Sequence, residues 1–221
     1  MKKLFPVLFI VLSSLTTLAQ PPKGMGNSDP DAKKILDAVS AKFKTYKTVK
    51  AGFALKVEGS NGKSQGNKAG TLYMKGTKYY VNVTGQEIFC DGTNIWTYDK
   101  SAKEVQITQF DPSSNTITPQ KLFTNFYDKD FLYKLNGEKK QGSTTLQEIE
   151  LTPIDKNKAF FKVLVNVNKS TQAIAATTVY DKNGNKYTYT VSNLTPNAAV
   201  NDSQFVFDAK KYPGVEVVDL R

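Results

Sequence analysis

The first regular pattern of apolar positions is helical and begins near residue 29. Asp29 supplies an N-cap acceptor, and Pro30 follows at the first helical position. The apolar residues that then recur at helical spacing on one side are Ala32, Ile35, Leu36, Val39 and Phe43. This pattern predicts an amphipathic helix that lies on an apolar surface.

From residue 49 the apolar positions alternate with period two, which predicts β-strands. The strand pattern covers residues 49–57, a meander over 70–99, and the segments 104–109, 131–135, 146–151, 160–167, 174–180, 186–194 and 204–207. Asn61-Gly62, Asn136-Gly137 and Asn183-Gly184 are dipeptides typical of hairpin turns. After the turn at 212–214 we expect an extended tail at 215–220.

A second helix is predicted to start at Thr118-Pro119, where a cap is again followed by proline. Leu122, Phe123 and Phe126 lie on one side of it. The helix is about ten residues long, so it needs tertiary contacts to be stable.

Together these elements predict a mainly β protein of the α+β class. About eleven strands joined by short links favour one curved antiparallel sheet, which we expect to curl into an incomplete barrel. Two or three short helices interrupt the strand order and are placed to cover its open side. Residues 29–221 are expected to form a single domain after a leader at 20–28, without internal repeats.

The amino terminus has the pattern of a secretory signal peptide. Lys2 and Lys3 precede an apolar run at 4–12, and Thr17-Leu18-Ala19 is a small-x-small cleavage site. The apolar run is too short to span a bilayer. We therefore expect export with cleavage after Ala19, and no lipid attachment there, since the residues directly after that site include no cysteine.

Composition excludes several classes of chemistry. The chain has 30 basic and 20 acidic residues, a net charge of +10, and no histidine. Without histidine, Ser-His-Asp and Cys-His sites and nearly all zinc sites are excluded. The basic charge suits anionic headgroups or acidic partners, or serves only as a solvated surface. Cys90 is the single cysteine, which excludes an internal disulfide and favours a buried, inert thiol.

Two weaker chemical patterns are present. Glu148 and Glu150 share one strand face, as a catalytic carboxylate pair does, although a solvent-facing pair explains them equally well. Lys75 and Lys78 lie among tyrosines, as in some nucleic-acid-binding proteins. Export to a compartment without nucleic acid argues against such a partner. No cofactor motif is complete, so no cofactor is expected.

The order and spacing of these elements resemble the outer-membrane lipoprotein carrier (LolA-like) family of the Gram-negative periplasm. The segments that carry the resemblance are the helix around 35–39, the strand around Phe53, 70–73, 90–98 (CDGTNIWTY), 118–122, 205–207 and 213–219.

The resemblance implies helices acting as a lid over an apolar cavity inside the incomplete barrel. It also implies a soluble, monomeric, non-catalytic periplasmic protein. Such a carrier takes the acyl chains of lipoproteins from an inner-membrane ABC-type transporter to the outer membrane, in some bacteria through an anchored receptor. The residues expected to line the cavity, with ordinary core packing as the alternative for each, are Leu36, Val39, Phe43, Tyr73, Tyr80, Phe89, Trp96, Tyr98, Leu122, Phe123 and Phe126.

One position departs from the family pattern. Relatives carry a lid-latching arginine where this chain has Gly76, and the flanking Lys75 and Lys78 lack the forked donors of arginine.

Two other functions stay open. One is a sensor of misplaced lipoproteins or another lipid on the same fold, and the other is a histidine-free module that binds or hydrolyses glycosides.

Overall fold

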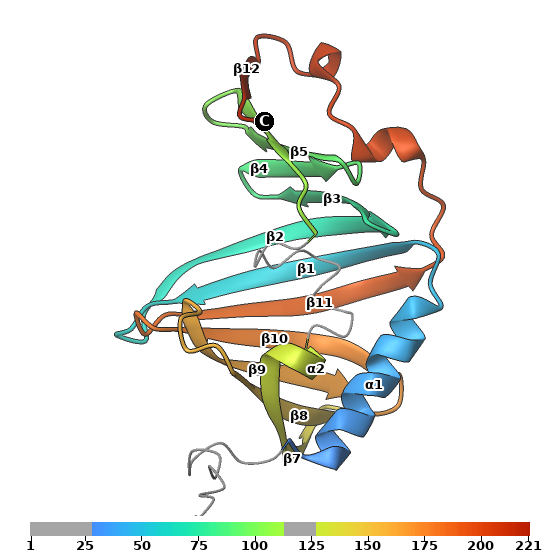
Figure 1. Cartoon of the computed structure of the whole chain (residues 1–221), viewed down its shortest axis with the longest axis vertical. Helices are drawn as coiled ribbons and strands as arrows, with labels where there is room; N and C mark the ends of the chain where they lie inside the picture. The colour runs from blue at the N-terminus through green and yellow to red at the C-terminus, as the bar shows by residue number, and fades with distance from the viewer. Residues whose placement is uncertain (1–27, 113–126) are drawn as a thin grey trace, which may run out of the picture.

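One open sheet of 12 strands makes up most of the described structure (Figure 1). The computed structural model describes residues 28–112 and 127–221. The strands are β1 (Val49–Glu58), β2 (Ser64–Lys75), β3 (Lys78–Val83), β4 (Gln86–Cys90), β5 (Asn94–Asp99), β6 (Glu104–Gln109), β7 (Phe131–Gln141), β8 (Thr144–Pro153), β9 (Phe160–Asn168), β10 (Ala173–Asp181), β11 (Lys186–Pro196) and β12 (Glu216–Asp219). The helices are α1 (Pro30–Lys44), α2 (Tyr127–Asp130) and the 3-10 helices η1 (Asp202–Phe205) and η2 (Ala209–Lys211).

The strand order is β12-β6-β5-β4-β3-β2-β1-β11-β10-β9-β8-β7. Consecutive strands pair in two antiparallel runs, β1 to β6 and β7 to β11, and β1 joins the runs by pairing with β11. Among these strands only β12 pairs in parallel, along β6. The expected mainly β, antiparallel and unclosed sheet is therefore confirmed.

Helix α1 forms where the helical pattern predicted it and lies across the sheet in front of β7 to β10 (Figure 1). The Asp29 side chain caps it by accepting from Asp31 N at 2.8 Å. The same residue anchors the helix to β7, because its backbone N–H donates to Tyr133 O and its carboxylate accepts from Leu135 N. These bonds hold the amino-terminal end of α1 at one edge of the sheet.

The apolar residues of α1 and one face of the sheet form the main core. We call this the helix face, and its buried members on the helix are Ala32, Leu36 and Val39. The buried apolar residues of the strands that pack in the same cluster are Val49, Ala51, Leu72, Met74, Tyr79, Cys90, Phe131, Tyr133, Ile149, Leu151, Val163, Val165, Val167 and Ile174. Cys90 is thus buried, as predicted.

A second layer covers the opposite face of the first run of strands. Residues 197–221, which we call the strap, leave β11, carry η1 past β3 and β4, and end in β12 (Figure 1). Phe205 is fully buried there, and the rings of Phe207 and Tyr212 pack on Phe89 and Tyr98. We call the covered side the strap face.

Two local predictions were wrong. The expected strand at 204–207 does not form. Residues 204 and 205 end the 3-10 helix η1, which Asn201 caps at Ser203 N and from which Phe205 turns into the strap-face core, and residues 206–207 follow it as an irregular segment. The expected turn at Asn136-Gly137 is a bulge inside β7. Gly137, at φ +128°, absorbs the register shift, and the chain turns at Gly142 instead.

Other predictions on the strands are confirmed. The turns at Asn61-Gly62 and Asn183-Gly184 are present, and the extended tail pairs with β6 as β12. The helix predicted from Thr118, with Leu122, Phe123 and Phe126, lies outside the described residues, as does the signal peptide.

Candidate functional site

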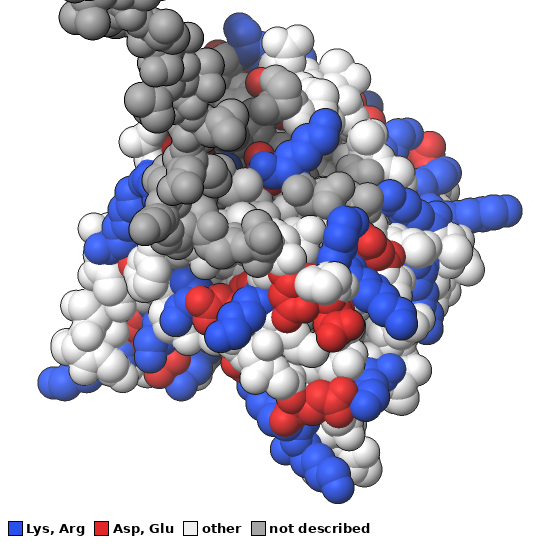
Figure 2. Space-filling model, turned by 60° about the horizontal axis from the view of Figure 1, so that its bottom comes forward, with Lys and Arg blue, Asp and Glu red and all other residues white. Residues whose placement is uncertain are grey.

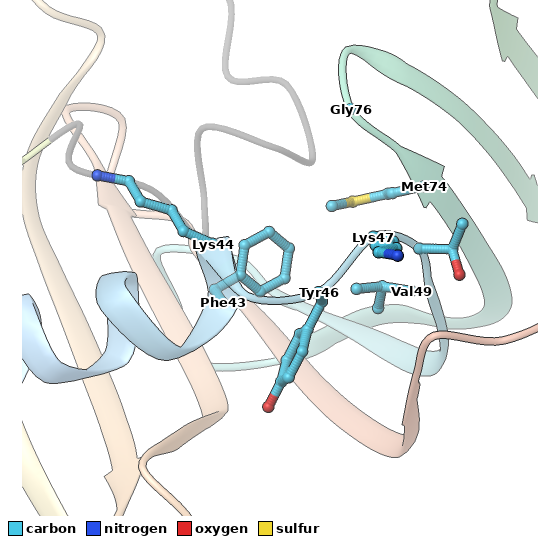
Figure 3. A pocket seen from close by; sticks show the side chains of 8 residues that line it. Phe43, Lys44, Tyr46, Lys47, Val49, Met74 and Gly76 are labelled. Atoms are coloured by element: carbon cyan, nitrogen blue, oxygen red, sulfur yellow. The ribbon is translucent and has the colours of Figure 1, made fainter.

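A pocket of about 200 Å³ opens at the carboxyl end of α1, on the helix face (Figure 3). It lies between the loop that joins α1 to β1 and the tight turn that joins β2 to β3. Its lining residues are Phe43, Lys44, Tyr46, Lys47, Thr48, Val49, Met74 and Gly76.

The lining is apolar at the base and basic at the rim. Val49 and Met74 are buried, and Phe43 packs edge to face on Tyr46 with ring centres 5.9 Å apart. Figure 3 shows the Phe43 ring and the Met74 thioether lying across the pocket from each other. Gly76 has φ +58°, a conformation that glycine adopts without strain, and it permits the sharp turn above Met74.

The apolar surface continues from the pocket along the helix face. Strand alternation and pairing place further half-buried apolar residues there, packed against the core: Phe53, Val81, Ile88, Ile95, Val191 and Leu194. Phe53 fits because its neighbour on β2 is Gly70, where a Cβ would lie 2.6 Å from the Phe53 ring.

The predicted helical site residues lie on this same side of the molecule. Phe43 lines the pocket itself. Leu36 and Val39 are buried between α1 and the sheet, with 4% and 6% of their surfaces exposed. Because their side chains lie between α1 and the sheet, they can contact a ligand only if α1 moves.

The five predicted aromatic residues of the strands lie on the strap face instead. Pairing places Tyr73, Tyr80, Phe89 and Trp96 side by side across β2 to β5, and Tyr98 alternates onto the same face. The ring centres of Tyr80 and Phe89 are 4.7 Å apart. The structure therefore brings these aromatics together, but not with the pocket.

The sequence reasoning missed the residues between these aromatics. Val81, Ile88 and Ile95 alternate with Tyr80, Phe89 and Trp96 and point to the helix face. Both faces of these strands carry apolar residues, and the larger aromatic ones were predicted to line the cavity. The sequence alone carries no signal that separates the two faces, and the pairing of Phe53 with Gly70 marks the helix face only in the structure.

A half-buried charged group, Glu87, lies within the strap-face layer. The Glu87 carboxylate accepts hydrogen bonds from Tyr212 Oη at 2.7 Å and Tyr80 Oη at 3.0 Å, and it pairs with Lys100 Nζ at 3.0 Å. Burial acts to raise the pKa of Glu87, but these donors outweigh it and lower the pKa. Burial and the nearby Glu87 raise the pKa of Tyr80 to about 12. This network ties the strap to β3 and β4.

The surface carries scattered positive charge. Figure 2 shows lysine side chains spread over the visible face with acidic side chains among them, rather than one basic patch. At the pocket rim Lys44 and Lys47 are exposed. Among residues 28–112 and 127–221, the potential ligand residues His, Cys, Asp and Glu form no cluster suited to a metal ion.

The possible catalytic pair is engaged in surface contacts. Glu148 pairs with Lys139 at 2.8 Å, and Asn136 Nδ2 lies within 3.4 Å of an oxygen of both Glu148 and Glu150. The bond from Lys139 lowers the pKa of Glu148. A general acid requires the opposite shift.

In the part of the chain that the structure describes, none of the helices has the length and apolar character that a membrane span requires.

Comparison with known proteins identifies relatives of this fold. A family model described as outer membrane lipoprotein carrier protein LolA matches residues 44–208. No curated protein matches the sequence.

Several solved structures match the chain at low identity. An uncharacterized conserved protein from Thermus thermophilus superposes with a TM-score of 0.58 at 11% identity, over 86% of this chain and 99% of that one. A LolA superfamily protein from Nitrosomonas europaea has a TM-score of 0.43 at 16% identity, over 80% and 98%. The Mycobacterium tuberculosis lipoprotein LppX has a TM-score of 0.47 at 14% identity, over 79% and 99%.

Proposed function

The chain belongs to the LolA family of outer-membrane lipoprotein carriers, and from this membership we propose that it is a periplasmic carrier of lipoproteins. In this proposal it shelters the acyl chains of its cargo on the helix face and performs no catalysis. Its partners are then an ABC-type lipoprotein-releasing transporter in the inner membrane and an acceptor at the outer membrane.

The observation that carries the proposal is the apolar helix face that extends beyond the pocket. Phe43, Val49 and Met74 form one end of it, and Phe53 and Val191 continue it along the central strands. Each methylene moved from water to such a surface contributes about 0.8 kcal/mol. An acyl chain lying along this face would therefore be held strongly without any specific polar contact.

The size of the pocket implies that the carrier opens to bind. At about 200 Å³ it is smaller than the roughly 300–1,000 Å³ of typical ligand sites. A long acyl chain fits only if α1 moves away from the sheet, which would add Leu36 and Val39 to the contact surface. The five strap-face aromatics are packed away from this path, and their contact with acyl chains stays a prediction.

The test compares two neighbouring residues of β11 that point to opposite faces. Val191 is half-buried on the helix face, whereas Thr190 is exposed on the other face. The mature protein should take up the fluorescent probe N-phenyl-1-naphthylamine, and a purified lipoprotein should displace it. Val191→Glu should weaken probe binding at least about tenfold, since burying a charge costs several kcal/mol. Thr190→Glu should bind as the wild type does.

Two outcomes would contradict the proposal. One is wild-type uptake of the probe no greater than that of a compact protein without a pocket. The other is equal binding by the two variants when circular dichroism shows that both are folded.

A further inference from the structure

Both walls of the pocket are bonded to one short segment at the start of the strap. On the first wall, Asn197 Oδ1 accepts from Lys47 N at 2.9 Å, and Asn197 N donates to Thr48 O at 2.7 Å. Thr48 Oγ1 also donates to Ala198 O at 2.6 Å. Lys47 and Thr48 line the pocket, so residues 197 and 198 fix the position of this wall.

The opposite wall is held by Asp202, a few residues further along the strap. Its carboxylate pairs with Lys75 Nζ at 2.6 Å and with Lys78 Nζ at 3.0 Å. These two lysines flank Gly76, which lines the pocket at the tip of the β2–β3 turn. Asp202 therefore contacts both the last residue of β2 and the first residue of β3.

We propose that residues 197–202 are a clasp that sets the separation of the two pocket walls, with Asp202 as its releasable end. This inference rests on the proposed ligand-binding function of the pocket. It makes Asp202 a positioning residue that controls ligand access without touching the ligand.

The two ends of the clasp differ in strength. The contacts of residues 197 and 198 involve backbone groups on one or both sides. The Asp202 contact joins exposed side chains, since 53% of the Asp202 side chain and 45% of the Lys75 side chain are accessible. Exposed ion pairs are weak and are screened by salt. The Asp202 end therefore releases first.

The tip of the turn is exposed on its Gly76 side. Among the described residues no atom lies within 4 Å of a Cβ built on Gly76, whereas Thr77, the other tip residue, lies beside Gly92 and accepts from Cys90 Sγ at 3.9 Å. Movement of the tip away from α1 would widen the pocket above Met74. The structure thus combines a weak contact with an exposed turn that this contact restrains.

The experiment measures the association rate of N-phenyl-1-naphthylamine by stopped flow, at low salt and at about 1 M salt, where the screening length falls to about 3 Å. Asp202→Asn should raise the low-salt rate between about twofold and thirtyfold, the range that loss of two exposed ion pairs predicts. The wild type should become faster in high salt, and the variant should hardly respond. The Lys75→Gln, Lys78→Gln double variant breaks the same contact from the other side and should match Asp202→Asn.

The control is Glu138→Gln, which removes the similarly exposed pair between Lys169 and Glu138 on the far run of strands. It should leave both the rate and its salt response unchanged. If Asp202→Asn takes up the probe at the wild-type rate, the clasp is wrong while the carrier function stands.

If the wild type takes up no probe, the carrier function fails instead. The clasp is then decided by amide exchange at residues 75–78. Faster exchange in Asp202→Asn than in the wild type supports the clasp, and unchanged exchange overturns it.

Discussion

At the scale of single residues, glycine at position 70 makes room for the helix face. A Cβ there would lie 2.4 Å from the backbone oxygen of Asn82 and 2.6 Å from the Phe53 ring. Backbone cannot yield as a side chain can, so even one added methyl group forces the two strands or the ring to move. The position of Phe53 in the apolar surface next to the pocket therefore depends on residue 70 being glycine.

Gly70→Ala should destabilise the protein by about 1–3 kcal/mol, because overpacking displaces both the ring and the strand. Gly59→Ala is the matched control, since its Cβ would meet chiefly the flexible end of the Gln65 side chain. Urea unfolding of both variants measures the difference. Equal stability of the two would show that Phe53 does not require the space at Gly70.

Glu87→Ala should destabilise the protein by about 1–3 kcal/mol, because Tyr80, Tyr212 and Lys100 lose their shared partner inside a covered layer. Glu87→Gln, which keeps an acceptor, should cost less. Chemical unfolding at neutral pH checks both values, and Glu148→Gln is the control, because its partly exposed carboxylate pairs with Lys139 at the surface. A loss in Glu87→Ala no larger than in Glu148→Gln would contradict a stabilising role of the Glu87 network.

The same carboxylate predicts a pH dependence. Its pKa in the folded protein is lower than the ordinary value of 4.5. Its contribution to stability is therefore complete above about pH 4.5 and is lost as the pH falls through the lower folded pKa. The wild type should lose stability in this acidic range more steeply than Glu87→Gln, as measured by thermal unfolding across pH. Parallel curves would show that Glu87 has the same pKa folded and unfolded.

At the scale of elements, hydrogen bonds hold α1 at both ends and near its middle. Asp29 fixes the start to β7, and Lys42 Nζ donates to Thr171 O near the end at 2.7 Å. In between, Tyr127 Oη of α2 donates to Asp37 Oδ1 at 2.8 Å. A movement of α1 away from the sheet must break this middle contact, and breaking it does not require the helix to unfold.

Tyr127→Phe should therefore loosen α1 selectively, because it removes the hydroxyl and keeps the ring. The expected loss of stability is about 1 kcal/mol. Amide exchange should become faster in α1, while strands β3 to β5 stay protected. Equal acceleration in both regions would mean that α1 does not move independently.

Most elements could be predicted from the sequence, because α1 and the strands carry clear periods and turn residues. The strap could not, because η1 is shaped by the burial of Phe205 and by Asp202 contacting lysines far away in sequence. The division of the aromatics between the faces was also out of reach. Tyr80 and its neighbour Val81 are both large and apolar, so alternation gave no preferred inward side.

At the scale of the whole molecule, the strap covers one face of strands in the first run, and α1 covers the opposite face of strands in the second run. Phe205, fully buried, lies in the layer that covers the strap face. Phe205→Ala should cost about 3–5 kcal/mol, since a large buried side chain leaves a cavity. Trp96, the single tryptophan, lies in a strand of that region and can report the unfolding by fluorescence. A cost similar to that of Val217→Ala, at an exposed site of β12, would contradict this layer.

The pairing of β1 with β11 has a consequence for how the chain acquires its shape. Val49 of β1 pairs with Pro196 of β11. The backbone hydrogen bonds along that edge of β1 therefore form only when residues near the carboxyl end of the chain are available. Contacts so distant along the chain slow folding, towards the millisecond-to-second range of sheet proteins. A polypeptide that stays open until it is almost complete would be compatible with the export that the signal-peptide pattern at residues 1–19 predicts.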